Sequence, residues 1–222
     1  MAWFTPDYNR FFKELAAHNN KEWFDANRTR YEATVKAPMQ AFVGELIQRI
    51  RKVDPQVTME PKQAIHRINR DIRFSKDKMP YKTYSSAIIQ RGEKKDMTTP
   101  GMYIELGPEN VWIYGGAYLP EKEQLYDIRD AMLKDGKAFR KAIAGKDFVK
   151  FFGSVQGEKN KVLPPEFKGA VAQEPLIANK QFYVAAKLPP KTVTADDLAE
   201  TVMAHYKAMK PMNDWLAKAM QG

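Results

Sequence analysis

The densest group of residues able to do chemistry is the stretch HRINRDIRFSKDKMPYKT, residues 66–83. From Lys62 to Thr83 there are seven Lys or Arg residues and two Asp, a net charge of +5, whereas the whole chain of 222 residues carries +9. Guanidinium and ammonium groups beside hydroxyls are the donors that bind phosphate or carboxylate. Because the positive charge is concentrated in one stretch, the sequence indicates a site for an anion.

The predicted ligand-binding residues share cationic, hydroxyl or aromatic side chains: Arg67, Arg70, Arg73, Ser75, Lys76, Lys78, Tyr81 and Lys82. Tyr81 is the residue expected to stack on a base or ring. The catalytic residues are unknown, and Asp71 and Asp77 are the candidates, since a carboxylate among cations can orient the arginines or act as a base. If the stretch is a site, Asp71 is expected to be buried and paired with an arginine.

A salt-bridge ladder on the surface of a hairpin is the competing interpretation of the same residues. Exposed ion pairs contribute roughly 0–1 kcal/mol each, so a ladder would aid solubility and would mark no site. From residue types alone, the ladder and the site are about equally supported.

As a strand, residues 65–74 would have two faces, because successive side chains alternate. One face is mostly apolar and is expected to meet the core, and it includes Ile68, Ile72 and Phe74. The other places Arg67 and Arg73 on the same side, where their guanidinium groups could hold one phosphate. A helix would also align several isoleucines, but the following Pro-containing turn and β-rich run favour an antiparallel hairpin over 64–91.

The elements that must position this stretch follow from the hydrophobic periodicity. Helices are expected over 7–18 and from about 20 to 52, with Pro38 breaking or kinking the second. Helical periodicity returns over 121–143 and 195–220. Strands grouped between helices indicate an α+β fold, in which helices from both terminal segments pack on a central antiparallel sheet. The expected strands, besides the hairpin, are 101–106, 111–118 and 181–188.

Length and composition favour one domain over residues 1–222, helical over 1–60, mainly β over 61–120, and helical with one strand over 121–222. The chain has no cysteine, which excludes disulfides, thiolate metal sites and a Cys nucleophile. Its three histidines lie far apart, so no metal site is predicted, and no cofactor is expected. Neither a signal peptide nor a membrane span is predicted, which makes the cytoplasm the default location.

Two long motifs are similar to a known family. RINRDIRFSKDKMPYKT resembles the hallmark of the domain-of-unknown-function family 2461 (DUF2461), found in bacteria and fungi, and FFKELAAHNNKEWFDANRTRYEATVKAP resembles its N-terminal motif. GMYIELGPENVWIYGGAYLP and LYDIRDAM match its order of segments. The resemblance covers most of the chain. It implies that the charged stretch and the Asn-Asn/Trp-Phe block belong to one recurring design, and it implies no particular activity.

Three functions from different classes stay open at this point. The first is binding of a small phosphate- or carboxylate-bearing ligand at the basic hairpin, with hydrolase- or transferase-type turnover as an extension. The second is a nucleic-acid-binding module, although a patch of +5 is small for a duplex footprint and no recognition-helix signature is present. The third is a protein-interaction domain whose hairpin meets an acidic surface.

Overall fold

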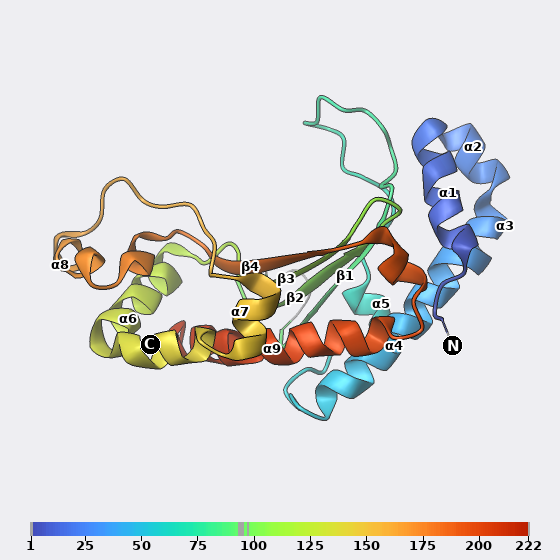
Figure 1. Cartoon of the computed structure of the whole chain (residues 1–222). Helices are drawn as coiled ribbons and strands as arrows, with labels where there is room; N and C mark the ends of the chain where they lie inside the picture. The colour runs from blue at the N-terminus through green and yellow to red at the C-terminus, as the bar shows by residue number, and fades with distance from the viewer. Residues whose placement is uncertain (1, 93–95, 97, 222) are drawn as a thin grey trace. The chain divides into compact units, whose positions relative to one another are not determined.

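The computed structural model describes residues 2–92, 96 and 98–221. In this part of the chain, four strands form an antiparallel sheet in the order β1-β2-β3-β4 (Figure 1). The strands are β1 (Ser85–Gln90), β2 (Gly101–Leu106), β3 (Val111–Ala117) and β4 (Phe182–Leu188). Helices precede β1 and follow β3 and β4, so the predicted α+β fold is confirmed.

The N-terminal helical segment contains a π-helical turn just before Pro38, through which the helix continues. It comprises α1 (Pro6–Ala17), α2 (Lys21–Ala26), α3 (Arg28–Tyr31), the π-helix η1 (Glu32–Lys36), α4 (Ala37–Arg51) and α5 (Pro61–Ala64). Proline has no N–H to donate to the preceding turn, and its ring crowds that turn. The widened π-turn lies directly before Pro38, where the sequence predicted a break or kink.

The later helices lie before and after β4 in the sequence. They are α6 (Lys122–Ile143), α7 (Lys146–Phe152), α8 (Pro165–Lys168), the short 3₁₀ turns η2 (Ala170–Ala172), η3 (Pro175–Ala178) and η4 (Pro190–Thr194), and α9 (Leu198–Ala219). No helix among the described residues combines the length and hydropathy that a membrane crossing needs.

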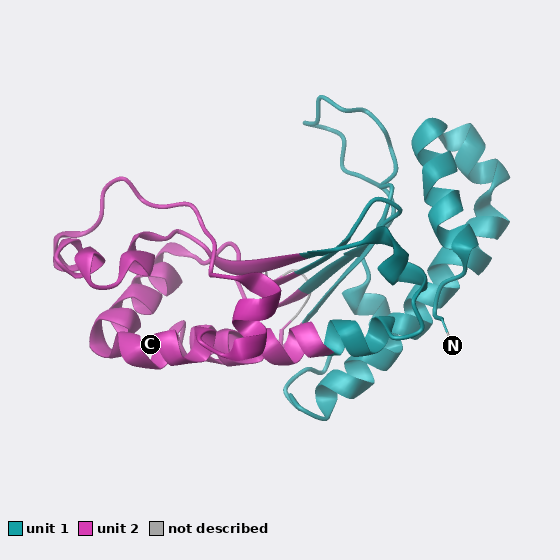
Figure 2. Cartoon of the chain, viewed as in Figure 1, with its two compact units in different colours: residues 1–89, 103–113, 187–203 teal, residues 90–102, 114–186, 204–222 magenta. Residues whose placement is uncertain are grey.

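Two compact units can be distinguished, coloured teal and magenta in Figure 2. Unit 1 contains residues 1–89, 103–113 and 187–203. Its core is aromatic: Phe4 packs on Tyr8 with ring centroids 4.5 Å apart, and Tyr8 packs on Phe12 at 5.1 Å. The buried Tyr8 hydroxyl donates to the carbonyl of Leu106 at 2.9 Å, which connects α1 to the end of β2.

Unit 2 contains residues 90–102, 114–186 and 204–222. Its aromatic packing includes the contact of Phe139 with Trp215, whose ring centroids are 4.6 Å apart. The buried Arg129 of α6 donates to the carbonyls of Ile177 and Asn179, at 2.9 and 3.0 Å. Through these bonds the buried guanidinium satisfies two backbone carbonyls of an irregular segment. Without it, both carbonyls would be buried and unpaired.

Strand β2 shows how the sheet exposes one face. Met102, Ile104 and Leu106 are fully buried, whereas Tyr103 and Glu105 between them are half-buried. Since alternate residues of a strand point to opposite faces, Tyr103 and Glu105 lie on the open face.

The predicted hairpin over 64–91 forms, but its first arm is not a regular strand. Isolated bridges join Ile65 to Ala87 and Asn69 to Tyr81, and β1 begins only at Ser85. Residues 66–83 project from the sheet as two connected chain segments (Figure 1). Phe74, which the strand pattern assigned to the core, is 96% exposed. The pattern was wrong here because a projecting two-stranded arm has no second layer to cover it.

Candidate functional site

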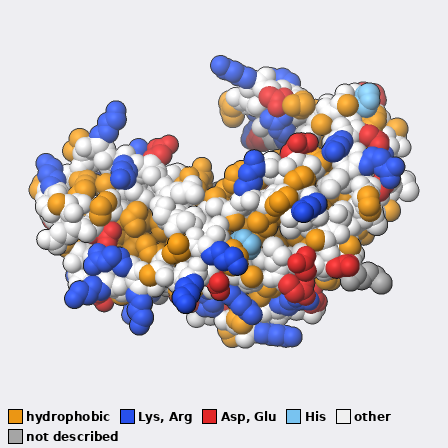
Figure 3. Space-filling view, viewed as in Figure 1, with side chains coloured by type: hydrophobic (Ala, Val, Ile, Leu, Met, Phe, Trp, Pro, Cys, Tyr) orange, Lys and Arg blue, Asp and Glu red, His pale blue; other side chains and the backbone are white. Residues whose placement is uncertain are grey.

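The tip of the hairpin pairs much of its own charge. Arg70 contacts Asp77 at 2.6 Å, and Arg73 contacts Asp71 at 2.7 Å. The Lys78 ammonium donates to the carbonyl of Ile72 at 3.0 Å. Figure 3 shows cationic, acidic and hydrophobic side chains interleaved on the visible face of the projecting hairpin. This part of the stretch therefore has the character of the salt-bridge ladder.

Asp71 is paired as predicted but is not buried. Its side chain is 48% exposed, so the expectation of a desolvated carboxylate was wrong. The side-chain and backbone hydrogen bonds from Arg73 lower the pKa of Asp71 to about 2. The pKa of Asp77 is also lowered, first by the backbone N–H of Met79 and then by Arg70. Both carboxylates are thus weak proton acceptors, because a general base works best with a pKa near the operating pH.

Tyr81 belongs to the packed interior and not to an open ligand-binding face. Only 6% of it is exposed, and its ring stacks on Phe24 with centroids 4.2 Å apart. The side-chain amide of Asn19 holds its backbone twice, since it donates to the Tyr81 carbonyl and accepts from the Tyr81 N–H, each at 3.0 Å. Asn20, the neighbour of Asn19, caps α2 by accepting from the N–H of Trp23.

A second group of polar side chains gathers where the hairpin joins the open face of the sheet. We call it the hairpin-base cluster. Tyr103 donates to Glu105 at 2.8 Å, and Tyr84 also hydrogen bonds to Glu105. The cluster consists of His66, Arg67, Lys82, Tyr84, Tyr103 and Glu105.

The electrostatics of this cluster centre on Lys82. Its ammonium lies 5.8 Å from the centre of the Tyr84 ring. Burial lowers the pKa of Lys82, the charge of Glu105 opposes that effect, and the positive charge of Arg67 adds to it. Arg67 itself is exposed and makes no ion pair with the described residues. The cluster therefore contains two cations that repel each other and one carboxylate.

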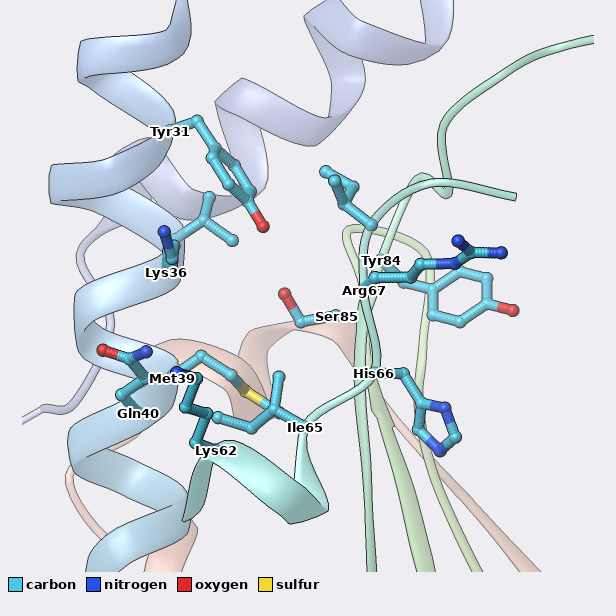
Figure 4. Close-up of a pocket in the computed structure, with 12 residues that line it drawn as sticks. Tyr31, Lys36, Met39, Gln40, Lys62, Ile65, His66, Arg67, Tyr84 and Ser85 are labelled. Atoms are coloured by element: carbon cyan, nitrogen blue, oxygen red, sulfur yellow. The ribbon is translucent and has the colours of Figure 1, made fainter. Parts of the chain in front are cut away.

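A cavity of about 220 Å³ lies on the other side of the hairpin base. In Figure 4 the side chains of Tyr31 and Ser85 point toward this hollow, whereas those of His66, Arg67 and Tyr84 extend away from it. The side chains of Tyr84 and Ser85 thus point to opposite sides of the hairpin base (Figure 4), although His66, Arg67 and Tyr84 of the cluster also contribute atoms to the cavity wall. The cavity is lined by Tyr31, Val35, Lys36, Met39, Gln40, Lys62, Ile65, His66, Arg67, Ile68, Tyr84 and Ser85.

Among the described residues, no group of three His, Cys, Asp or Glu side chains is arranged to hold a metal ion.

A family model described as "Conserved hypothetical protein (DUF2461)" matches residues 7–215 of the chain. The chain belongs to the DUF2461 family. The match includes α1, the hairpin and all four strands, and it confirms the resemblance seen in the sequence motifs. A search of curated proteins found no match to this DUF2461 protein.

Two of the residues that the sequence predicted as ligand-binding lie in the hairpin-base cluster, namely Arg67 and Lys82. Arg70, Arg73 and Lys78 engage partners within the hairpin, and Lys76 and Ser75 lie on its tip segment. Glu105, Tyr84 and Tyr103 of the cluster were not among the residues predicted from the sequence. The available signal was parity, since Tyr103 and Glu105 alternate with buried apolar residues in GMYIEL.

Proposed function

We propose that this DUF2461 protein binds a small phosphate- or carboxylate-bearing ligand at the hairpin-base cluster. The observation that carries this proposal is Lys82, a partly buried cation whose pKa is lowered by burial and by the nearby charge of Arg67. An anion that contacts both side chains would replace this repulsion with charge-assisted hydrogen bonds. Each such bond contributes roughly 1.5–3 kcal/mol.

The tyrosine hydroxyls support the same ligand class. Burial and the hydrogen bond to Glu105 raise the pKa of Tyr84, and burial raises that of Tyr103, so both hydroxyls are protonated donors at neutral pH. Glu105 accepts from them and orients them. A ligand oxygen that replaced Glu105 as the acceptor in either hydrogen bond would find a tyrosine hydroxyl already oriented to donate.

Turnover of the hydrolase or transferase type would need a base close to the bound anion. Asp71 and Asp77 are held in exposed ion pairs at the hairpin tip, whereas Glu105 is part of the cluster. Glu105 is therefore the residue to replace in an activity test. Hydrolysis of p-nitrophenyl phosphate that is lost in Glu105→Gln and kept in Asp71→Asn would assign the base to Glu105.

The binding proposal is tested by a melting-temperature titration with phosphate, at constant ionic strength and against chloride. Phosphate at 100 times its Kd is expected to stabilise the protein by about 2.7 kcal/mol. For a chain of this size, that corresponds to a rise of roughly 5–10 °C. Lys82→Gln and Arg67→Gln should each abolish most of the rise.

Lys76→Gln is the matched control, because it removes a cation from the hairpin tip and leaves the cluster intact. Its phosphate response should equal that of the unmodified protein. Equal shifts with phosphate and chloride would contradict the proposal. A response that survives Lys82→Gln but disappears in Arg73→Gln would place the anion at the tip.

A further inference from the structure

The cavity behind the hairpin base differs chemically from the hairpin-base cluster. Its aliphatic and thioether walls come from Val35, Met39, Ile65 and Ile68. Of the described residues that line it, none is Asp or Glu, whereas Lys36 and Lys62 are cationic and Arg67 extends its guanidinium away from the hollow (Figure 4). An apolar chamber with a cationic border suits a molecule with an apolar body and one negative end.

Two hydroxyls inside the cavity provide its polar contacts. Those of Tyr31 and Ser85 approach each other across the hollow in Figure 4. Burial, with a further contribution from the charge of Glu32, raises the pKa of Tyr31 to about 12, so its hydroxyl is a donor at neutral pH. No described residue accepts a hydrogen bond from this hydroxyl. Ser85 is already engaged with the buried Tyr8, so Tyr31 is the donor left for a ligand.

The helical wall of the cavity is the π-helix η1 and its two neighbouring turns. Tyr31 lies directly before η1, Val35 and Lys36 lie within it, and Met39 follows in α4. A π-turn has poorer backbone geometry than an α-turn and occurs frequently at functional sites. Here it changes the angle between Tyr31 and Met39, both of which line the cavity, relative to a continuous α-helix.

We infer that this cavity is a second ligand site, which binds a short monocarboxylate with an apolar body. The carboxylate accepts a hydrogen bond from Tyr31, and the positive charge of Lys62, which forms no ion pair with the described residues, favours an anion in the cavity as a whole. Lys36 is less available, since it contacts Glu32 at 2.8 Å. The apolar body fills the space beside Met39 and Ile65. The volume of about 220 Å³ is below the roughly 300–1,000 Å³ that is typical of ligand pockets, which limits the ligand to a short chain or single ring.

The test uses hexanoate as the probe, with hexan-1-ol as its neutral analogue, and follows the melting temperature and methyl NMR of labelled methionine. Hexanoate should give a saturable rise in melting temperature that hexan-1-ol does not match. Nuclear Overhauser contacts should join its methylene protons to the Met39 methyl. Tyr31→Phe should weaken the apparent affinity for hexanoate about fivefold, the typical effect of one hydrogen bond.

Tyr126→Phe is the control, because it removes an exposed tyrosine hydroxyl in unit 2 and should leave the affinity for hexanoate unchanged. The inference is overturned if hexanoate gives no saturable rise, if Tyr31→Phe binds it equally well, or if no contact to Met39 is seen. The variant Lys82→Gln distinguishes the anion site at the hairpin-base cluster from the ligand site in the cavity. Loss of the phosphate response with hexanoate binding retained supports the cavity as an independent site.

Discussion

At the scale of single residues, Asp7 and Asp71 have similarly lowered pKa values but different surroundings. Both pKa values are lowered to about 2, mainly by hydrogen bonds from arginine. Asp7 bonds to Arg30, which is 23 positions away, and these side chains are 29% and 26% exposed. Asp71 bonds to Arg73, two positions away, and these are 48% and 77% exposed. Only the Asp7 pair depends on tertiary structure, because neighbours in sequence can also pair in the unfolded chain.

Asp7→Asn is therefore expected to lower the free energy of unfolding at pH 7 by about 1–2 kcal/mol, after allowance for solvent screening. A carboxylate whose folded pKa is depressed stabilises the protein above its unfolded pKa, here 3.8. The difference between variant and unmodified protein should disappear as the pH falls from about 4 to about 2. Denaturant unfolding across this pH range measures it.

Asp71→Asn is the matched comparison for Asp7→Asn. Since its carboxylate is exposed and its partner is local, the free energy of unfolding should stay within the scatter of ordinary surface substitutions at every pH. A large loss of stability in this variant would mean that Asp71 is more desolvated in solution than in the structure.

At the scale of elements, the hairpin is attached to the N-terminal helices through Asn19. Its amide makes two hydrogen bonds to the backbone of Tyr81, and Phe24 of α2 stacks on the Tyr81 ring. The two asparagines of the Asn19-Asn20 motif thus have different roles, because Asn19 binds the backbone of Tyr81 and Asn20 caps α2. Asn19 does not cap a helix, because its amide is used for the hairpin. The resemblance implied that the two motifs form one design, and these contacts provide a physical reason.

Asn19→Ala should destabilise the protein by roughly 1–3 kcal/mol, because it leaves backbone groups of a buried residue without partners. The amide of Tyr81 should also exchange with solvent faster. Asn20→Ala should cost about 1 kcal/mol through the lost helix cap, and it should leave exchange at Tyr81 unchanged. Hydrogen exchange measured by NMR distinguishes the two variants. Equal protection of Tyr81 in both would show that Phe24 alone holds the hairpin.

At the scale of the whole molecule, the charge distribution favours the proposed small anion over nucleic acid as the ligand. The stretch from Lys62 to Thr83 carries +5, and the other 200 residues carry only +4. Within the hairpin, Arg70 and Arg73 are already paired with aspartates. Few cations are left to replace counterions on a phosphate backbone, chiefly Arg67, Lys76 and Lys82.

Binding of a mixed-sequence single-stranded oligonucleotide should therefore depend weakly on salt. About three phosphate contacts predict a slope of log K against log salt of roughly −2, and a steeper slope would require more contacts. Fluorescence anisotropy from low to physiological salt measures it. A slope beyond about −4, reduced by Phe74→Ser at the exposed hairpin tip, would favour the nucleic-acid-binding function over the proposed one.

The sequence by itself determined the α+β class, strands β2, β3 and β4, and the family, whereas the strand expected over 65–74 did not form. The alternation of apolar and polar residues in GMYIEL and the Gly and Pro residues around the strands are local signals. Local signals can be recognised without knowing which residues are in contact. The same was true of the irregular helical turn near Pro38, since a missing N–H acts wherever proline occurs. The charged stretch was also visible in the sequence, together with its two possible meanings.

Only the tertiary structure decided how the charges of that stretch are divided. Arg70, Arg73 and Arg67 have the same chemistry, yet two of them are neutralised by nearby aspartates and the third joins Lys82 at the hairpin base. Glu105 and Tyr31 reach the cluster and the cavity from segments far away in sequence. Such contacts depend on which elements pack together, and a one-dimensional pattern of residue types does not contain that information.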